Sequence, residues 1–454
     1  MAYNFFEEFE DNTHIKNRQV KDFHTIVEEV QEHISNKHSG LLSSDKSVSK
    51  IKEQIKLIIE KYISDNGLFV ENLSHTELID KISSEMVEYS FLTDYIFTKN
   101  NDIEEININS WEDIKINYSD GSTVTAKEKF NSPQHAVNVI RKLLRESNMI
   151  LDNSYPVTRG HLSNKIRITC CGGEIIDKHI GVVASIRIIN PKKLGKQDFI
   201  NNGTGTQEMF DFLEIVLRYG LSICVGGSTN TGKTTFMSWL LQTLPDYKRT
   251  ITVEDGVREF DLIKKDEEGR VLNNIVHLTT KRSENKNQNI DQLKLLEYSL
   301  TMNPDYICMA EMKGGEAYAA QEAGRTGHTI ITTVHTNSSM ATYSRLATLC
   351  GLENNLDNTT LMNLVTEAFP IVLFMKRGED GVRRIMEITA TTTLSNGEIE
   401  RITLWKFKTE KNEINSKGER QIIGHFEKLN SISENIVSIL RGNGAPDEVI
   451  EKLI

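Results

Sequence analysis

The feature that most restricts the fold of this chain is a glycine-rich segment at residues 227–234, which reads GSTNTGKT. It matches the pattern G-x-x-x-x-G-K-[ST], in which a loop between a strand and a helix binds phosphate. The flanks fit that arrangement, because the apolar run LSICV precedes the loop and the helix-like run TTFMSWLLQTL follows it. A turn that matches by chance would require neither flank. The segment therefore predicts a phosphate-binding loop in an α/β fold.

Each residue type in this loop has a physical role. Glycines allow backbone N–H groups to approach phosphate oxygens without an intervening Cβ atom, and the helix N-terminus adds a partial positive charge. Lys233 is expected to contact the β- and γ-phosphates, and the Thr234 hydroxyl is expected to bind Mg²⁺. We therefore predict ATP and Mg²⁺ as cofactors, bound by Gly227, Ser228, Thr229, Asn230, Thr231, Gly232, Lys233, Thr234 and Thr235.

The sequence around and after this loop alternates between helical and strand-like patterns. We expect a helix at 207–219 and short apolar strands at 221–225, 249–253, 306–310 and 328–334. This alternation favours a parallel sheet joined by crossover helices. A polar stretch at 408–420 reads as a solvated loop or a hairpin.

Upstream, residues 1–90 show apolar residues at helical spacing, and residues 91–195 alternate polar and apolar positions as half-buried strands do. Within the second region we expect a helix at 133–147 and strands at 166–171, 174–178 and 181–189. The predicted organisation is a helical extension at 1–90, a smaller α+β domain at 91–195, a linker at 196–205 and an α/β domain at 206–454.

Composition excludes several classes of protein. Lys and Arg number 53 against 64 Asp and Glu, a net charge of −11, so no global basic field favours nucleic acid. The five cysteines are odd in number and form no CxxC pair, which argues against a disulfide framework or structural zinc. The N-terminus has no signal-peptide pattern, and no apolar run has membrane-spanning length. We expect a cytoplasmic protein whose membrane contact is peripheral and made through a partner.

Two predicted strands end in carboxylates. Residues 251–259 read ITVEDGVRE and place Glu254 at a strand end, with Asp255 and Glu259 after it, and a second buried strand ends at Glu311. Ligands of open parallel sheets lie at the carboxyl ends of the strands, where carboxylates can hold Mg²⁺ or orient water. Either segment alone fits ordinary surface carboxylates, but their order after a phosphate loop favours a site.

Two histidines, His328 and His335, bracket the apolar strand predicted at 328–334. A lone histidine is more often structural than catalytic, but a pair on a strand beside a phosphate site favours sensing of the γ-phosphate. Zinc binding does not fit, because no cysteine cluster would complete the coordination shell.

In this order the motifs resemble those of the secretion ATPase superfamily, whose members power type II and type IV secretion, conjugation and pilus assembly. The phosphate loop resembles that family's Walker A motif, and TVEDGVRE, LTMNPDYICMAEMKGGEA and GHTIITTVHTNS resemble its Asp box, Walker B motif and His box. The resemblance covers roughly residues 90–405 and is greatest to the Tad/Flp pilus and conjugation-type branch. It implies a RecA-like C-terminal ATPase domain and a homohexameric ring.

The resemblance also implies roles for individual residues. Thr234, Glu254 and Glu311 would hold Mg²⁺ and polarise water, with the choice of base between the two glutamates left open. His328 and His335 would sense the nucleotide. Three arginines of the α+β domain would approach the phosphates, some of them in a neighbouring subunit: Arg159, Arg167 and Arg187.

The chain departs from the family at the end of the Walker B strand. The usual Gly-Glu-x-Arg is replaced by Ala310-Glu311-Met312-Lys313, and lysine cannot reproduce the bidentate fork of arginine. The tetracysteine zinc module of many type II secretion and pilus-extension ATPases is also missing, which argues against that branch.

The predicted function is Mg²⁺-dependent ATP hydrolysis by a hexameric motor at the cytoplasmic face of the cell membrane. The motor would power pilus assembly, secretion or conjugative transfer, and would dock on an inner-membrane platform protein through residues 1–90.

Two alternatives stay open. A RecA-like DNA translocase is disfavoured by the acidic charge, since no direct nucleic-acid contact is expected. A non-hydrolysing nucleotide-binding scaffold would be consistent with Ala310 and Lys313. The cargo, whether pilin, toxin or DNA, is left open.

Overall fold

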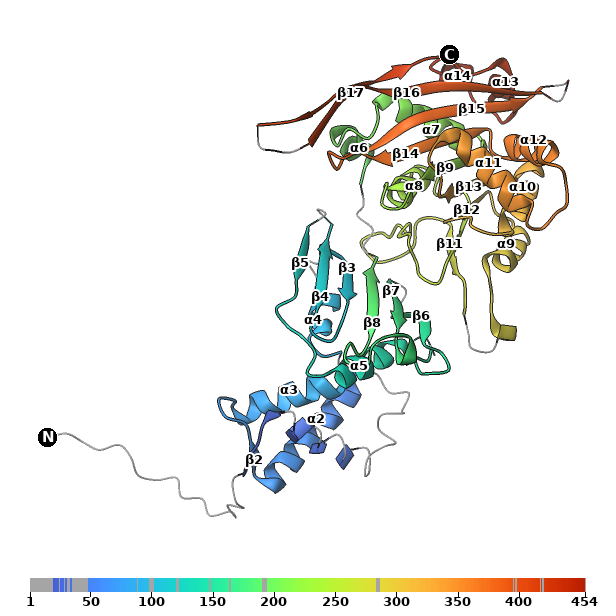
Figure 1. Ribbon diagram of the computed structural model, residues 1–454. Coiled ribbons are helices and arrows are strands. Elements are labelled where there is room, and N and C mark those ends of the chain that lie inside the picture. The colour runs from blue at the N-terminus through green and yellow to red at the C-terminus, as the bar shows by residue number, and fades with distance from the viewer. Residues whose placement is uncertain are drawn as a thin grey trace. The chain divides into compact units, whose positions relative to one another are not determined.

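The structure is a computed structural model (Figure 1). It describes residues 19–23, 25–27, 29–30, 33–34, 48–87, 89–97, 102–119, 122–145, 147, 149–162, 165–189, 194–282, 286–394, 396, 398–416, 418 and 420–453. The chain divides into two compact units. The N-terminal unit comprises Met1–Glu146, Ile150–Arg159 and Ile168–Ile188, and the C-terminal unit comprises Ser147–Met149, Gly160–Arg167 and Ile189–Ile454.

The N-terminal unit begins with helices that share a small apolar core. Helices α2 (Val48–Asn66) and α3 (His75–Val87) pack together, and Ile55, Ile59 and Ile63 of α2 are fully buried against Leu78 and Ile82 of α3. The spacing of these residues places them on one helical face. Strands β1 (Gln19–Val20) and β2 (Leu68–Phe69) form a short parallel pair beside them, and α4 (Leu92–Phe97) follows. Other parts of the predicted helical extension, including residues 1–18 and 35–47, lie outside the described residues.

A six-stranded sheet follows, in the order β5-β4-β3-β8-β7-β6. Strand β3 pairs antiparallel with β4 and with β8. Helix α5 (Pro133–Arg145) buries Ala136, Val139 and Ile140 on one face. The strands are β3 (Ile103–Ile108), β4 (Ile114–Tyr118), β5 (Thr123–Thr125), β6 (Val157–Leu162), β7 (Ile166–Cys171) and β8 (Val183–Ile188).

The strand predicted at 174–178 is wrong. Residues Gly173–Ile175 instead form a single 3₁₀ turn between β7 and β8. Gly173 has a φ angle of +66°, in the left-handed region that strands do not use, and the Ile175 side chain is exposed. The apolar residues that suggested a strand therefore belong to a surface turn.

The C-terminal unit is built on a nine-stranded sheet in the order β11-β10-β12-β13-β9-β14-β15-β16-β17. The strands from β11 to β14 are parallel, and the last three are antiparallel. The predicted α/β class with a mostly parallel sheet is confirmed. The strands are β9 (Ile223–Gly227), β10 (Thr250–Glu254), β11 (Ile275–Thr279), β12 (Tyr306–Met309), β13 (Thr329–Val334), β14 (Ile371–Arg377), β15 (Arg383–Thr393), β16 (Ile399–Ile414) and β17 (Arg420–Lys428).

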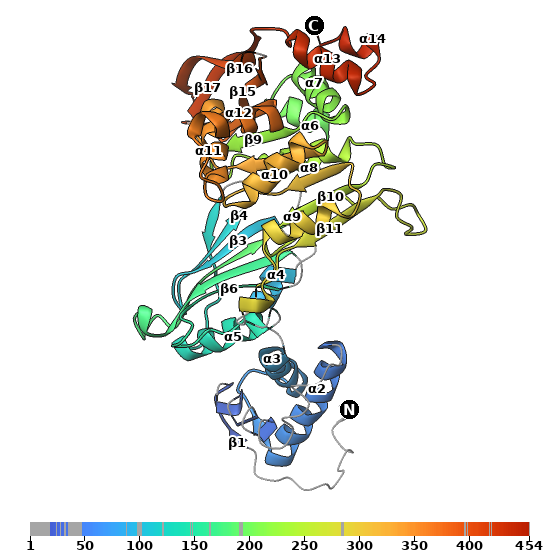
Figure 2. The same cartoon turned by 90° about the vertical axis from the view of Figure 1, so that its right-hand side faces the viewer.

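Two apolar clusters cover the two faces of this sheet. Ile223 and Val225 of β9 belong to one cluster, and Cys224 between them belongs to the other, as expected when successive side chains alternate across a strand. Helices α6 (Lys196–Asn201), α7 (Gln207–Arg218), α8 (Lys233–Gln242), α13 (Glu434–Gly442) and α14 (Asp447–Ile450) supply the first cluster. Helices α9 (Gln292–Leu300), α10 (Glu316–Arg325), α11 (Ser339–Cys350) and α12 (Asn358–Ala368) supply the second (Figure 2).

Two segments with loop-like sequences turn out to be ordered parts of this unit. Within 196–205, predicted as a linker, residues 196–201 form α6, and Phe199 packs with its ring centroid 5.6 Å from those of both Phe236 and Trp239. The described residues of 408–420 lie in the β16–β17 hairpin, so the hairpin alternative is confirmed. The other boundaries predicted at 90 and 195 stay predictions. None of the described helices is long and apolar enough to cross a membrane.

Candidate functional site

The loop at residues 228–232 joins the buried strand β9 to helix α8, which confirms the predicted strand–loop–helix arrangement. Gly227 is required by space, because a Cβ atom there would lie 2.5 Å from the carbonyl oxygen of Met375 on β14. Gly232 has a φ angle of +87° and caps the start of α8 in the left-handed conformation. The loop therefore passes closely over the sheet and presents the N-terminus of α8 at its carboxyl edge.

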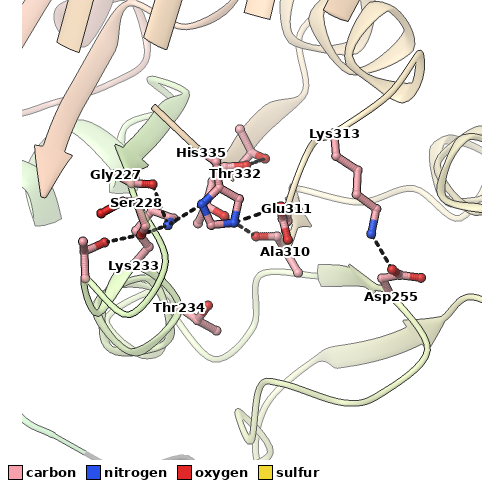
Figure 3. Close-up of polar contacts among 12 residues, drawn as sticks. Gly227, Ser228, Lys233, Thr234, Asp255, Ala310, Glu311, Lys313, Thr332 and His335 are labelled. Atoms are coloured by element: carbon pink, nitrogen blue, oxygen red, sulfur yellow. Dashed lines mark hydrogen bonds and ion pairs between the residues drawn. The ribbon is translucent and has the colours of Figure 1, made fainter. Parts of the chain in front are cut away.

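Lys233 turns back onto this loop (Figure 3). Its Nζ donates hydrogen bonds to the carbonyl oxygens of Gly227 at 2.8 Å and Ser228 at 2.7 Å. Burial lowers the pKa of Lys233 to about 8, although the nearby carboxylates of Glu311 and Glu259 act in the opposite direction. The Thr231 hydroxyl also donates to the Ser228 carbonyl, at 2.9 Å. The lysine thus lies at the centre of the loop with its charge directed inward.

Glu259 faces the loop, although the sequence prediction did not include it in the site. Its Oε2 lies 3.4 Å from the Thr234 hydroxyl. It belongs to the segment ITVEDGVRE, but the pattern alone gave no reason to prefer it over Glu254. The structure therefore adds a carboxylate beside the predicted magnesium ligand Thr234.

Glu254 occupies a different environment. Its side chain is fully buried, and its Oε1 accepts a hydrogen bond from the Thr252 hydroxyl at 2.6 Å and lies 3.0 Å from His277 Nδ1. Its Oε2 accepts from the backbone N–H groups of Glu259 and Phe260. Both oxygens are therefore engaged: Oε1 contacts side chains of β10 and β11, and Oε2 fixes the segment that follows β10 and carries Glu259.

Glu311, His335 and Lys233 lie in a row across the carboxyl ends of β12, β13 and β9 (Figure 3). His335 Nε2 lies 3.2 Å from Glu311 Oε1, and His335 Nδ1 lies 3.5 Å from Lys233 Nζ. Burial and the charge of Lys233 lower the pKa of His335, while Glu311 opposes that shift. The structure thus joins three predicted site residues through one imidazole ring.

The structure does not bring His328 to this group. His328 precedes the first residue of β13, whereas His335 follows the last. At about 3.3 Å per strand residue, seven residues separate their Cα atoms by about 23 Å. An odd separation also directs two side chains to opposite faces of a strand. The structure therefore places His328 apart from Lys233, Glu311 and His335, and its role as a sensor of the γ-phosphate stays a prediction.

Lys313, the residue that departs from the family pattern, has a defined partner in Asp255 (Figure 3). The same carboxylate accepts from the Thr280 hydroxyl at 2.8 Å and lies 3.7 Å from Arg282. Ala310, the other departure, is buried in the core. Lys313 therefore links the segment after β12 to the segment after β10 in this structure.

The three predicted arginines lie on the six-stranded sheet, with Arg159 on β6, Arg167 on β7 and Arg187 on β8. Arg187 is exposed and pairs in register with Glu105 of β3. Their approach to a bound nucleotide stays a prediction. Among the described residues no cluster of three or more His, Cys, Asp or Glu side chains could hold a metal by itself.

Comparison with known proteins finds similarity to secretion system proteins in this region. Residues 174–371 match the profile of a family described as "Type II/IV secretion system protein". The type IV secretion system protein PtlH of Bordetella pertussis is 33% identical over 184 residues, which are 39% of this chain and 52% of PtlH. The type IV secretion system protein VirB11 of Brucella suis is 35% identical over 143 residues, 31% of this chain and 37% of VirB11. The chain thus spans about half the length of PtlH and less of VirB11.

Among solved structures, the VirB11 ATPase of the Brucella suis type IV secretion system in complex with sulphate aligns with 64% of this chain and 92% of its own. The sequence identity is 22% and the TM-score is 0.33, so the description of the fold rests on the sheet itself. The profile match covers the phosphate loop, Glu311 and His335. Residues 174–371 of this chain are thus similar to the family described as "Type II/IV secretion system protein".

Proposed function

We propose that this chain is a Mg²⁺-dependent ATPase that works as a motor in a secretion or pilus system. The observation that carries the proposal is the convergence of Lys233, Thr234, Glu259, Glu311 and His335 at the carboxyl edge of a parallel sheet. This is the edge where open α/β sheets bind ligands. The match to the family profile supports nucleotide use, and the relatives are proteins of type IV secretion systems.

The residues of the loop fit a nucleoside triphosphate. Backbone N–H groups and the start of α8 would bind the phosphate oxygens. The Lys233 ammonium would contact the β- and γ-phosphates in place of the carbonyl oxygens that it contacts in this structure. Mg²⁺, held by the Thr234 hydroxyl and the phosphates, would neutralise charge that develops on the phosphate oxygens. In-line attack by water then needs a carboxylate that orients the water.

Two carboxylates, Glu259 and Glu311, face the loop and are the candidates for that task. Glu259 lies beside the Thr234 hydroxyl, and Glu311 contacts His335. We assign to Glu254 a different role from the predicted one, because both its oxygens already accept hydrogen bonds: Oε1 from Thr252 of β10, and Oε2 from the segment that carries Glu259. Glu254 would position the segment, and Glu259 and Glu311 would act on water and metal.

Assembly into a homo-oligomer, with the hexamer as the expected form, belongs to the same proposal. Two arguments support assembly. The first is the family resemblance. The second is that phosphoryl transfer uses arginines near the phosphates, which Arg159, Arg167 and Arg187 of a neighbouring subunit would supply in a ring. Docking on an inner-membrane platform protein, at the cytoplasmic face of the membrane, would bring the motor to its substrate. Residues 1–90 are the expected docking element, and α2 and α3 are the helices of this region that the structure describes in full.

The test is steady-state Mg-ATP hydrolysis per subunit, measured against protein concentration and paired with a mass measurement. Hydrolysis that rises steeply with concentration supports sites completed by a neighbouring subunit. The Lys233→Ala variant should lose hydrolysis and binding of ADP. Binding without hydrolysis at any concentration, with or without membrane partners, would favour the non-hydrolysing scaffold. Stimulation by DNA would favour the translocase.

A further inference from the structure

Arg383 lies outside the phosphate-loop pattern, yet it contacts the tip of the loop at two points. It opens strand β15 and follows Asn230 by 153 residues. Its Nε donates a hydrogen bond to the Asn230 carbonyl oxygen at 3.2 Å, and its Nη2 donates to the Asn230 Oδ1 atom at 2.8 Å. One guanidinium group therefore holds both the backbone and the side chain of a single loop residue.

Asn230 is a residue whose conformation needs such support. Its φ angle is +60°, in the left-handed region that residues with a Cβ atom rarely adopt. Asparagine tolerates this region better than most residues, but the conformation persists only where the surroundings fix it. The two hydrogen bonds from Arg383 act on this strained position.

The aliphatic part of Arg383 contacts the other end of the loop. A Cβ atom added to Gly232 would lie 3.0 Å from Arg383 Cδ. Gly232 is the residue immediately before Lys233 and caps helix α8. Arg383 therefore spans the loop from its tip at Asn230 to the point where the helix begins.

The base of Arg383 is itself fixed. Its backbone pairs with Arg377 of β14, and the next residue, Arg384, donates hydrogen bonds to both carboxylate oxygens of Asp380, at 3.0 and 2.7 Å. The Arg384 guanidinium also lies 5.0 Å from the centre of the Phe407 ring on β16. Arg383 and Arg384 thus connect the phosphate loop to the antiparallel strands at the end of the sheet.

We propose that Arg383 is a positioning residue for nucleotide binding: it holds Asn230 in the left-handed conformation so that the loop N–H groups face the phosphates. The inference rests on the proposed function, since it requires that the loop binds ATP or ADP. It goes beyond that function because it assigns the shape of the loop to β15, one of the antiparallel strands of the nine-stranded sheet.

The test compares Arg383→Ala with Arg420→Ala, using binding of a fluorescent N-methylanthraniloyl ADP and the kinetics of Mg-ATP hydrolysis. Arg420 is a matched control, because it is an exposed arginine of β17 whose partner is Glu379. The Arg383→Ala variant should raise the ADP dissociation constant and KM about tenfold, the size expected for a lost charge-assisted hydrogen bond, with kcat changed less than about threefold. Equal affinities in the two variants would overturn the inference.

A double-mutant cycle with Asn230→Ala separates positioning from a general loss of structure. Asn230→Ala removes the side-chain acceptor and leaves the backbone carbonyl. If Arg383 acts through Asn230, the arginine substitution should therefore weaken ADP binding less in the Asn230→Ala background than in the unmodified protein. Independent, multiplicative effects would overturn the mechanism. Should Arg383→Ala fail to fold, Arg383→Lys retains the charge and the aliphatic stem but lacks the fork, and should weaken binding about threefold.

The two proposals fail in different ways. If the unmodified protein does not bind the ADP analogue, the proposed function fails and this inference fails with it. If the unmodified protein binds and Lys233→Ala does not, while Arg383→Ala binds normally, the proposed function stands and the role of Arg383 alone is refuted.

Discussion

The two halves of the nine-stranded sheet differ in burial and in what they contribute to the site. Every residue of β9, β10, β12 and β13 is buried. In β16 and β17 exposed and half-buried residues dominate. The parallel half holds Lys233, Glu311 and His335, whereas the antiparallel half holds Arg383, which contacts the loop from the side. A site of this kind therefore needs a buried half that bears the reacting groups and a second half that shapes the loop between them.

The largest expected change in activity concerns three glutamates of the parallel half, of which two are proposed to act on water or metal and one to position the segment after β10. Glu259→Gln and Glu311→Gln should each lower kcat about 100-fold or more, since each removes a carboxylate that acts on water or metal. Glu254→Gln should instead lower the melting temperature, because a buried hydrogen-bond acceptor is replaced. The measurements are hydrolysis rates and thermal unfolding. A Glu254→Gln variant with normal stability and no activity would return Glu254 to the catalytic role first predicted from the sequence.

A smaller effect is expected from the two histidines at opposite ends of β13. His335→Ala should lower kcat about tenfold, because it removes the hydrogen-bond partner of Glu311. His328→Ala should leave kcat within about twofold of the unmodified protein, because His328 lies at the opposite end of β13 from Glu311. The measurement is kcat at saturating Mg-ATP. An equal loss of kcat in the two variants would contradict the inference that only His335 lies at the site.

The pH dependence of phosphate binding provides a third test of the parallel half. The pKa of Lys233 is lowered to about 8, so its ammonium loses its proton as the pH rises through that value. A phosphate beside Lys233 favours the charged form and should raise this pKa. Binding of ADP above pH 8 should therefore take up a proton. Calorimetry in buffers of different ionisation enthalpy measures this uptake, which should vanish in Lys233→Ala.

The smallest expected effect on activity lies in the antiparallel half. Asp380→Asn should cost about 1–3 kcal/mol of stability, because Asp380 and Arg384 form a mostly buried pair with two hydrogen bonds. Burial alone would raise the pKa of Asp380, but the bonds from Arg384 lower it below its usual value. The stabilisation is therefore present above the unfolded pKa and is lost as the pH falls through the folded pKa.

Denaturant unfolding at pH 7 and at acidic pH measures this effect in the unmodified protein and in Asp380→Asn. The difference between the two proteins should shrink in acid, while the hydrolysis rate at pH 7 changes less than about threefold. A difference that stays constant with pH would mean that the carboxylate charge does not contribute.

Much of the parallel half could be predicted from the sequence, because strands buried on both faces read as short apolar runs between helices. The strands predicted at 221–225, 249–253, 306–310 and 328–334 all correspond to observed strands of this sheet within a few residues. Strands β14 and β15 were not predicted. Nor was the 3₁₀ turn at Gly173, where apolar residues lie on the surface.

The site was predictable in part. The loop pattern located Lys233 and Thr234, since glycine and lysine spacing has a direct physical meaning there. No spacing rule could separate Glu254 from Glu259, because the difference lies in which carboxylate accepts backbone N–H groups. The role of Arg383 depends on a contact across 153 residues, which only the fold reveals.

The contacts of Lys233 with the carbonyl oxygens of Gly227 and Ser228 have a consequence for turnover. A phosphate that reaches the lysine replaces two acceptors that are already in place, so binding is an exchange of partners and its net free energy is smaller than the new contacts alone would give. The same exchange works in reverse after hydrolysis, when the carbonyl groups can take back the ammonium as the product leaves. In the proposed motor, which would release ADP in every cycle, a loop that competes with its own ligand would favour that release.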